Sequence, residues 1–89
     1  MDIQRWIDEK CVVGSGANSR ISDLWFSFDR WLWEQTDKTP HLVDGKWPKQ
    51  KDLRQALLDA GFIRGGYKST PLFVGIQVKH WIDDNRWTT

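Results

Sequence analysis

The chain of 89 residues predicts a small α+β fold in which three helices precede a β-hairpin. Two patterns of apolar residues indicate this order. Three segments repeat apolar side chains at the spacing of a helix, and residues 72–78 alternate them at the two-residue period of a half-buried strand. The chain also contains seven tryptophans, and side chains of that size let a short chain bury a large apolar area per residue.

The first helix is expected over residues 2–13, DIQRWIDEKCVV, with Asp2 as a candidate N-cap and Gly14 as its stop. One apolar stripe would face the core: Ile3, Trp6, Ile7 and Cys11. The GSGANS of residues 14–19 is expected to be a turn-rich connector. It lacks the preceding strand and the Gly-Lys-Ser/Thr of a P-loop, so a plain turn is favoured over a phosphate cradle.

Residues 20–36, RISDLWFSFDRWLWEQT, form the clearest helical pattern. Ser22 is a suitable N-cap, because its hydroxyl can accept a hydrogen bond from an otherwise unpaired amide, and Arg20-Ile21 are a candidate short strand ahead of it. Phe26 and Trp33 would lie on the outer face, either covered by neighbouring segments, which we favour, or forming a partner-docking patch. The core stripe would consist of Leu24, Trp25, Phe28, Trp31 and Leu32.

A connector over residues 36–48, TDKTPHLVDGKWP, leads to the third helix, and its Thr-Pro, Asp-Gly and Trp-Pro pairs predict turns. The helix is expected to begin near Pro48, which suits a first helical position because it has no amide to leave unpaired. Gly61 is expected to end it in the left-handed conformation. Its inward side chains would be Leu53, Ala56, Leu57 and Ala60.

The last regular element is a hairpin. Phe62–Arg64 would form its first strand, the GGYKSTP of residues 65–71 its loop, and residues 72–78 its second strand. The polar tail that follows has three candidate anchors onto the core: Trp81, Ile82 and Trp87.

Helix, short strand, helix, helix and hairpin is the order of a winged helix, which is a three-helix helix-turn-helix core with a C-terminal β-hairpin wing. In that arrangement the third helix enters the DNA major groove and the hairpin lies beside it on the backbone. The whole chain, residues 1–89, would form this single domain, with a core over about residues 2–78 and a polar C-terminal tail over residues 79–89.

Charge is divided unevenly along the chain. Residues 1–44 carry five Lys/Arg against eight Asp/Glu, whereas residues 45–89 carry eight against four, so the formal net charges are −3 and +4. Between Lys46 and Lys79 there are seven basic side chains and two acidic ones. A basic excess on one helix and one hairpin is expected of a phosphate-binding face, although a solvated helix face explains the charge alone equally well.

Four motifs follow one another over roughly residues 6–78, and in this order and spacing they resemble the C-terminal domain of phage, plasmid and poxvirus-type primase-helicases. Each motif alone is weakly specific. Two features depart from the family pattern: HLVDGK lengthens the connector, and Lys49 stands where a helix-capping serine is common. The matching residues are WIDEKCVV at Trp6–Val13, then Ser22, Asp23, Leu24, Trp25, Phe28, Arg30 and Trp31, then Gln50, Lys51, Leu53, Ala56, Leu57, Gly61 and Phe62, and last Gly75-Ile76.

The resemblance implies a winged helix that binds nucleic acid, for example at a replication origin or on an unwound template. The primase and helicase modules themselves are not in this sequence, so the chain would be a piece of a larger primase-helicase or a free-standing relative. We therefore expect a non-catalytic DNA-binding module of phage- or plasmid-type DNA replication, acting on duplex or single-stranded DNA. A protein–protein interaction module that docks a helicase, a polymerase or a neighbouring subunit is the alternative.

The expected DNA contacts divide between the third helix and the wing. The lysines would meet phosphates, while Arg54 and the two glutamines could reach base edges. The helix residues are Lys49, Gln50, Lys51, Arg54 and Gln55, and the wing residues are Arg64, Tyr67 and Lys68.

No catalytic residue, metal site or cofactor is expected. His41, His80 and Cys11 lack zinc spacing, so we expect a surface position for each histidine and a small core residue at Cys11. The adjacent acidic pairs Asp8-Glu9 and Asp83-Asp84 do not mark an acid/base site, because neighbouring side chains point in different directions. A single cysteine, the absence of a secretory signal and the absence of an apolar run of about 18 residues favour a cytoplasmic location, in a bacterium or a host cell, without a membrane partner.

Overall fold

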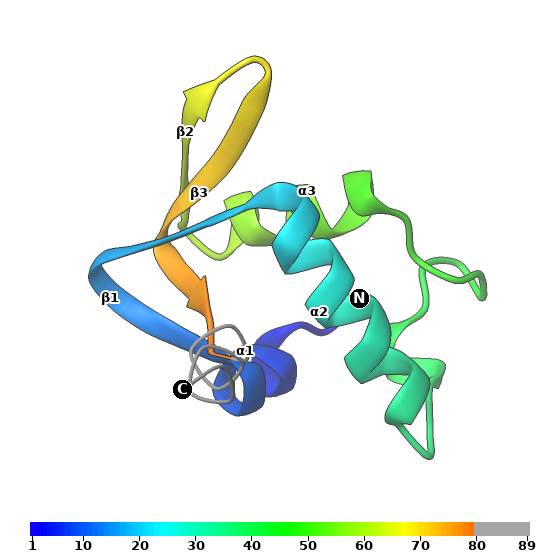
Figure 1. Ribbon diagram of the computed structural model, residues 1–89. Helices are drawn as coiled ribbons and strands as arrows, with labels where there is room; N and C mark the ends of the chain where they lie inside the picture. Colours follow the sequence, from blue (N-terminus) through cyan, green and yellow to red (C-terminus); the bar gives the residue numbers. More distant parts are fainter. Residues whose placement is uncertain (80–89) are drawn as a thin grey trace.

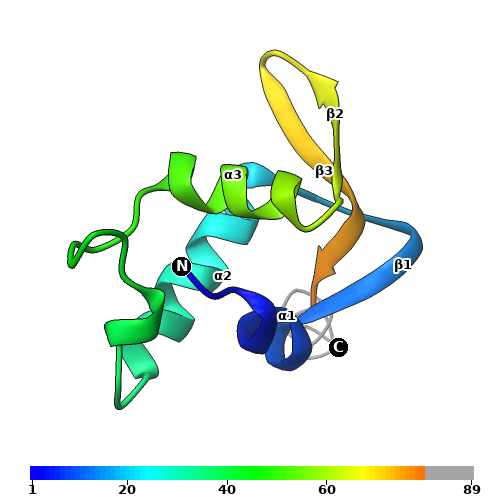
Figure 2. The same ribbon diagram turned by 180° about the vertical axis from the view of Figure 1, so that it is seen from behind.

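A computed structural model describes residues 1–79 (Figures 1 and 2). Its three strands form one antiparallel sheet in which β3 lies between β1 and β2. The predicted α+β class is confirmed, with three α-helices and a three-stranded sheet. The elements are α1 (Gln4–Lys10), β1 (Cys11–Arg20), α2 (Ile21–Glu34), the short 3-10 helix η1 (Thr39–His41), α3 (Gln50–Asp59), β2 (Ile63–Tyr67) and β3 (Thr70–Val78).

The hairpin of β2 and β3 projects beyond the helices. In both views its tip extends away from α2 and α3, while the other end of β3 returns beside α1 and β1 (Figures 1 and 2). The chain passes from α3 into β2 through Gly61, whose φ of +99° is the left-handed stop that the sequence predicts. The Phe62 amide donates to the Leu57 carbonyl across this turn at 3.1 Å. The third helix thus leads directly into the hairpin through a hydrogen-bonded turn.

The first helix is shorter than predicted, because the segment after it is a strand. α1 ends at Lys10, and residues 11–19, expected to be the end of a helix and a turn-rich connector, belong to β1. β1 pairs with β3 at both of its ends, over residues 11–13 and 18–20, and the Lys79 amide donates to the Lys10 carbonyl at 2.8 Å just beyond the paired region. A distant partner strand satisfies the backbone groups here, and local periodicity gives no sign of such a partner.

Glycine accommodates an irregularity in the centre of the sheet. The register of β1 against β3 shifts around residues 14–17, and Gly75 of β3 has a φ of +98°, a region that favours glycine. The shift changes which side chains of β3 face the core, since Phe73 and Ile76 are buried whereas Val74 is 43% exposed. The strand predicted here is confirmed, but its simple alternation breaks at the glycine.

Aromatic side chains of α1 and α2 form the centre of the core. Trp6 meets Phe28 edge to face, with ring centroids 5.4 Å apart. The Trp6 Nε1 donates to the Ser27 Oγ at 3.1 Å, which satisfies the buried indole. Within the predicted stripe of α2, Trp25 is only partly buried. The other four members are buried as predicted: Leu24, Phe28, Trp31 and Leu32.

Both long helices begin at other residues than predicted. The N-cap of α2 is Arg20, not Ser22, because β1 runs directly into the helix and leaves Arg20 with extended backbone angles. α3 begins after Lys49 rather than near Pro48, which is itself buried ahead of the helix. The Asp52 carboxylate accepts a hydrogen bond from the Lys49 amide at 2.7 Å, and it thereby stabilises a helix start that has no serine.

The connector between α2 and α3 is well organised. His41, expected at the surface, is 2% exposed, and its Nδ1 donates to the Asp2 carbonyl at 3.0 Å. The expectation was wrong because η1 turns this ring against Trp31 of the core, with centroids 4.9 Å apart. Asp44-Gly45 has φ values of 51° and 75°, the two left-handed residues of a tight turn between the bridged residues Val43 and Lys46.

The hairpin turn is much tighter than predicted. β2 and β3 remain paired as far as Tyr67 and Thr70, so Lys68 and Ser69 alone form the turn. The loop expected over residues 65–71 is therefore mostly strand. Gly66 has a φ of +80°, and a Cβ there would lie 2.4 Å from the Thr70 carbonyl oxygen, so this position of β2 requires glycine.

Within residues 1–79, no helix is both long and apolar enough to cross a membrane. The predicted anchors Trp81, Ile82 and Trp87, together with His80, lie outside the described residues.

Candidate nucleic-acid interface

The third helix presents a polar face because its apolar face is used in the core. Leu53 and Leu57 are buried, each 1% exposed, and they fix the rotation of α3. Ala60, expected to face inward, is exposed at the end of the helix. Arg54 is half-buried, and the other predicted contact residues of the helix are exposed: Lys49, Gln50, Lys51 and Gln55.

Arg64 of β2 lies against this polar face. It pairs with Phe73 of β3, and since paired residues share a face of the sheet, its side chain leaves the sheet on the side of the core and of α3. A hollow between the helix and the strand is lined by residues of both: Lys51, Asp52, Arg54, Gln55, Leu58 and Arg64. The fold thus brings together two arginines that are ten positions apart in the sequence.

A second hollow continues from this point along the hairpin. Its walls include the small residues Gly65 and Gly66, which leave the backbone of β2 accessible. Lys68, exposed in the turn, lies at its far end. The lining is Arg54, Arg64, Gly65, Gly66, Lys68 and Pro71.

A third hollow lies between the hairpin turn and the start of α2. It contains Arg20, which the sequence did not mark as a contact residue. The sequence shows Arg20 only as a basic residue immediately before the clearest helix. It becomes a candidate contact residue because β1 places it opposite Leu72 of β3. The lining is Arg20, Ile21, Ser22, Gln50, Arg54, Ser69, Thr70 and Pro71.

These three hollows together form what we call the α3–hairpin surface, and Arg54 lines all of them. Asp52 is the one acidic residue among the residues that line them, and its carboxylate already accepts the Lys49 amide. An excess of one charge sign makes such a surface attractive to a polyanion. The basic residues are Arg20, Lys51, Arg54, Arg64 and Lys68.

Two of the predicted contact residues, Lys49 and Tyr67, are described separately from the α3–hairpin surface. Lys49 lines a further hollow on the connector side of α3, beside Trp47 and Lys51. Tyr67 pairs with Thr70 through its backbone, and its side chain lies outside what the structure describes. The other predicted residues, Gln50, Lys51, Arg54, Gln55, Arg64 and Lys68, line the α3–hairpin surface.

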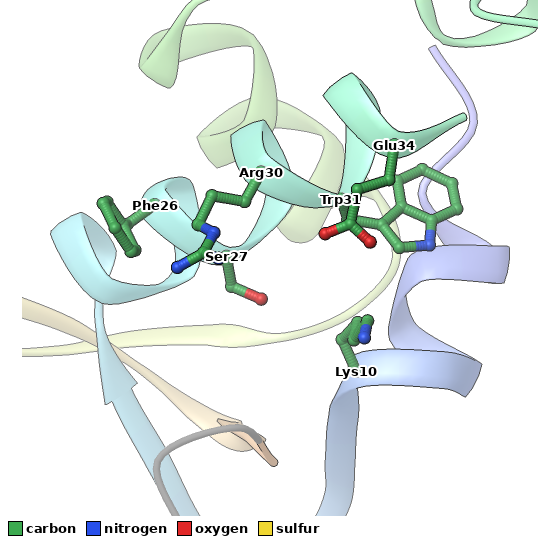
Figure 3. A pocket seen from close by; sticks show the side chains of 6 residues that line it. All are labelled: Lys10, Phe26, Ser27, Arg30, Trp31 and Glu34. Carbon is green, nitrogen blue, oxygen red and sulfur yellow. The ribbon is translucent and has the colours of Figure 1, made fainter. Parts of the chain in front are cut away.

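A separate hollow, which we call the α1–α2 hollow, lies between the end of α1 and the outer side of α2 (Figure 3). Phe26 is 51% exposed there, and the Arg30 guanidinium lies 5.7 Å from its ring centroid, within cation–π range. Lys10 and Glu34 line the hollow from the two helices (Figure 3). The lining is Lys10, Phe26, Ser27, Arg30, Trp31 and Glu34.

Cys11 packs in the core at the start of β1, 7% exposed. Burial raises the pKa of its thiol to about 12, so the side chain is a neutral thiol rather than a nucleophilic thiolate near pH 7. Among residues 1–79 no group of three or more His, Cys, Asp or Glu is arranged to hold a metal ion.

Comparisons of the chain with protein-family models, with curated proteins and with solved structures find no match.

Proposed function

We propose that this chain is a non-catalytic winged-helix module that binds DNA through the α3–hairpin surface. In this proposal α2 and α3 are the helix-turn-helix, β2 and β3 are the wing, and β1 completes the sheet at the base of the wing. The order of elements and the antiparallel β1–β3–β2 sheet are compatible with that arrangement.

The observation that carries the proposal is the position of Arg54 and Arg64 in one hollow. They come from different elements, yet both line the space between α3 and the hairpin. Arg64 is exposed and Arg54 half-buried, so neither residue belongs to the core. Guanidinium groups are preferred partners of phosphate, because their planar donors match its oxygens in pairs.

The proposal assigns different roles to the two parts of the surface. α3 would enter the major groove, with Lys49 and Lys51 on phosphates and Arg54 positioned for base edges. The turn residue Lys68 and the backbone beside Gly66 would follow a neighbouring phosphate backbone. Gln50 and Gln55 would be additional base contacts, although the Gln55 side chain donates to Asp59 at 3.0 Å and would exchange that bond on binding.

We further propose that the module serves DNA replication of the phage or plasmid type, within or alongside a primase-helicase, in a bacterial or host cytoplasm. The support is the resemblance of the sequence motifs alone. Nine of the 24 residues that carry it are buried in the core, and these bear on a shared fold rather than on a shared DNA sequence. They include Trp6, Leu24, Phe28, Trp31, Leu53, Leu57 and Ile76.

A second candidate function is protein docking, and the α1–α2 hollow favours it. Its lining has two cations, one carboxylate and an exposed phenylalanine. Mixed charge around an aromatic residue suits a protein partner better than a polyanion. In this alternative the lysines of α3 would be only a solvated face.

Fluorescence anisotropy of a labelled duplex, measured at several salt concentrations, tests the proposal. If α3 and the hairpin contact phosphates, log affinity should fall with log salt by about 0.9 for each contact. The double variant Arg54→Ala/Arg64→Ala should lose most of the affinity. Arg5→Ala removes one positive charge from an exposed position of α1, where the double variant removes two, and it controls for loss of charge outside the α3–hairpin surface.

Either of two results would contradict the proposal. Wild-type protein that does not bind duplex or single-stranded DNA at low salt, or an Arg5→Ala variant as weak as the double variant, would rule out the α3–hairpin surface. Capture of a replication protein that is lost on Phe26→Ala would then favour the docking function.

A further inference from the structure

Two tryptophans stack at the surface on the side of α3 away from the hairpin. Trp33, near the end of α2, and Trp47, in the connector just before α3, have ring centroids 4.8 Å apart at an interplanar angle of 39°. In both views the connector lies beside α2, and the hairpin projects on the opposite side of α3 (Figures 1 and 2). The pair therefore lies beyond the N-terminal end of the proposed recognition helix.

The two rings are held very differently. The Trp47 Nε1 donates to the Asp29 Oδ1 at 2.9 Å, and Pro48, the next residue, is buried. Trp47 is thus fixed by the fold. Trp33 is 66% exposed even though it stacks on Trp47. An indole whose only role was packing would be expected to bury most of its area, because burial is what stabilises an apolar side chain in water.

A hollow beside Trp47 connects this pair to the α3–hairpin surface and carries three lysines against two aspartates, while the Asp29 carboxylate contacts Trp47 itself. This hollow includes Lys51, which also lines the hollow shared with Arg64. Two acidic residues, Asp44 and Asp52, lie among three lysines, and Asp52 already accepts the Lys49 amide. The full lining is Val43, Asp44, Lys46, Trp47, Lys49, Lys51 and Asp52.

We propose that Trp33 is a stacking platform for an unpaired DNA base, and that a single strand leaving the bound duplex passes over the lysines beside Trp47 to reach it. This inference rests on the proposed function, because it needs duplex DNA on α3. An exposed indole with a fixed ring behind it can stack on any base, and the lysines supply contacts to the connecting phosphates. The preferred ligand would then be a duplex with a single-stranded extension.

The length of α2 gives an estimate of how long the single-stranded extension must be to reach Trp33. Ser22 lines the third hollow at the start of the helix, and Trp33 lies eleven residues further along it, about 16 Å at about 1.5 Å per residue. An unpaired strand that keeps the duplex rise of about 3.4 Å per nucleotide would need roughly five nucleotides to cover that distance. One or two unpaired nucleotides should therefore give no gain in affinity.

The test compares a blunt duplex with the same duplex carrying extensions of one to ten nucleotides at either the 5′ or the 3′ end, by anisotropy at constant salt. Wild-type protein should bind one of the two polarities about five- to 100-fold more tightly once the extension reaches roughly five nucleotides. Trp33→Leu, which keeps an apolar contact to Trp47, should lose this gain and keep its affinity for the blunt duplex. Trp33→Phe should retain part of it.

Phe26→Ala is the matched control, since Phe26 is an exposed aromatic residue of the same helix outside the proposed path. Far-ultraviolet circular dichroism and thermal denaturation of Trp33→Leu establish whether the fold is kept. If neither polarity tightens binding, or if Trp33→Leu keeps the gain, the platform is refuted while the duplex function stands. If the blunt duplex itself does not bind, the failure lies with the proposed function.

Discussion

The α3–hairpin surface and the α1–α2 hollow both place arginine at an accessible hollow, yet they differ in charge and construction. The first has five basic residues against one acidic residue, drawn from β1, α3, β2 and the hairpin turn. The second has Lys10 and Arg30 against Glu34, with Phe26 and Trp31 as its apolar part. A surface of one charge sign suits a polyanion, whereas mixed charge around an aromatic residue suits a protein.

The arginines of the two regions also differ in what surrounds them. Arg30 already has a partner, the Phe26 ring. At the α3–hairpin surface, by contrast, Arg54 lies half-buried near Arg64 and close to Arg20, an arrangement in which like charges repel. Repulsion of this kind lowers stability, and it is relieved when an anion binds. The comparison therefore predicts that removing an arginine relieves repulsion at the α3–hairpin surface, whereas Arg30→Ala loses the contact with the Phe26 ring.

The largest expected effect comes from the core that supports both regions. Phe28→Ala should lower the free energy of unfolding by about 3–5 kcal/mol, because the ring is fully buried between Trp6 and Trp31. Chemical denaturation measures it. Phe26→Ala, two positions away and half-exposed, is the control and should cost far less. A loss of under about 1 kcal/mol for Phe28→Ala would show that α2 packs by another face.

The next largest effect distinguishes a contact between Arg54 and a base from a contact between Arg54 and a phosphate. Arg54→Ala should reduce the difference in binding free energy between a preferred and a random duplex by about 1–3 kcal/mol if Arg54 contacts a guanine. Selection from a random library followed by anisotropy on the best site measures the difference. Arg30→Ala, which alters the α1–α2 hollow, should leave it unchanged. Equal losses on all sequences would instead make Arg54 a phosphate contact.

The buried thiol of Cys11 gives a pH-dependent effect. Between pH 9 and about 12 folded Cys11 keeps a proton that the unfolded chain releases, so the free energy of unfolding should fall as pH rises through this window. The slope contributed by one such group is at most about 1.4 kcal/mol per pH unit. Denaturation of wild type against Cys11→Ala isolates it. Parallel pH profiles of the two proteins would contradict the burial of this thiol.

The smallest expected effect concerns one lysine of the turn. Lys68→Ala should weaken binding to all DNA sequences about equally and reduce the slope of log affinity against log salt by about 0.9, the value for one phosphate contact. Lys10→Ala removes a lysine from the α1–α2 hollow and should leave the slope unchanged. If the slopes of both variants equal that of wild type, the hairpin turn does not contact phosphate.

Much of this architecture was predictable because it depends on local patterns. The stripe of α2, the core leucines of α3 and the stop at Gly61 follow from helical spacing and from the conformational freedom of glycine. The polar residues of α3 follow in turn, because burial of Leu53 and Leu57 determines which side chains face solvent. The candidate site on the helix was therefore accessible from the sequence.

What was missed depends on pairing between distant segments. Residues 11–19 form a strand only because β3 lies beside them, and Arg20 joins the candidate site only because that strand carries it to the hairpin turn. The burial of His41 depends on a contact with Trp31 and the Asp2 carbonyl, neither of which is a neighbour in the sequence. The periodicity of a single sequence cannot predict these contacts between distant residues.

The most direct test of the central claim is a titration of ¹⁵N-labelled protein with a short duplex, followed by amide chemical shifts. Binding at the α3–hairpin surface predicts the largest shifts at the amides of Arg20, Lys49–Gln55, Arg64 and Lys68, with little change at Lys10, Phe26 and Arg30. Shifts concentrated at Lys10, Phe26 and Arg30, or no shifts at low salt, would contradict the account.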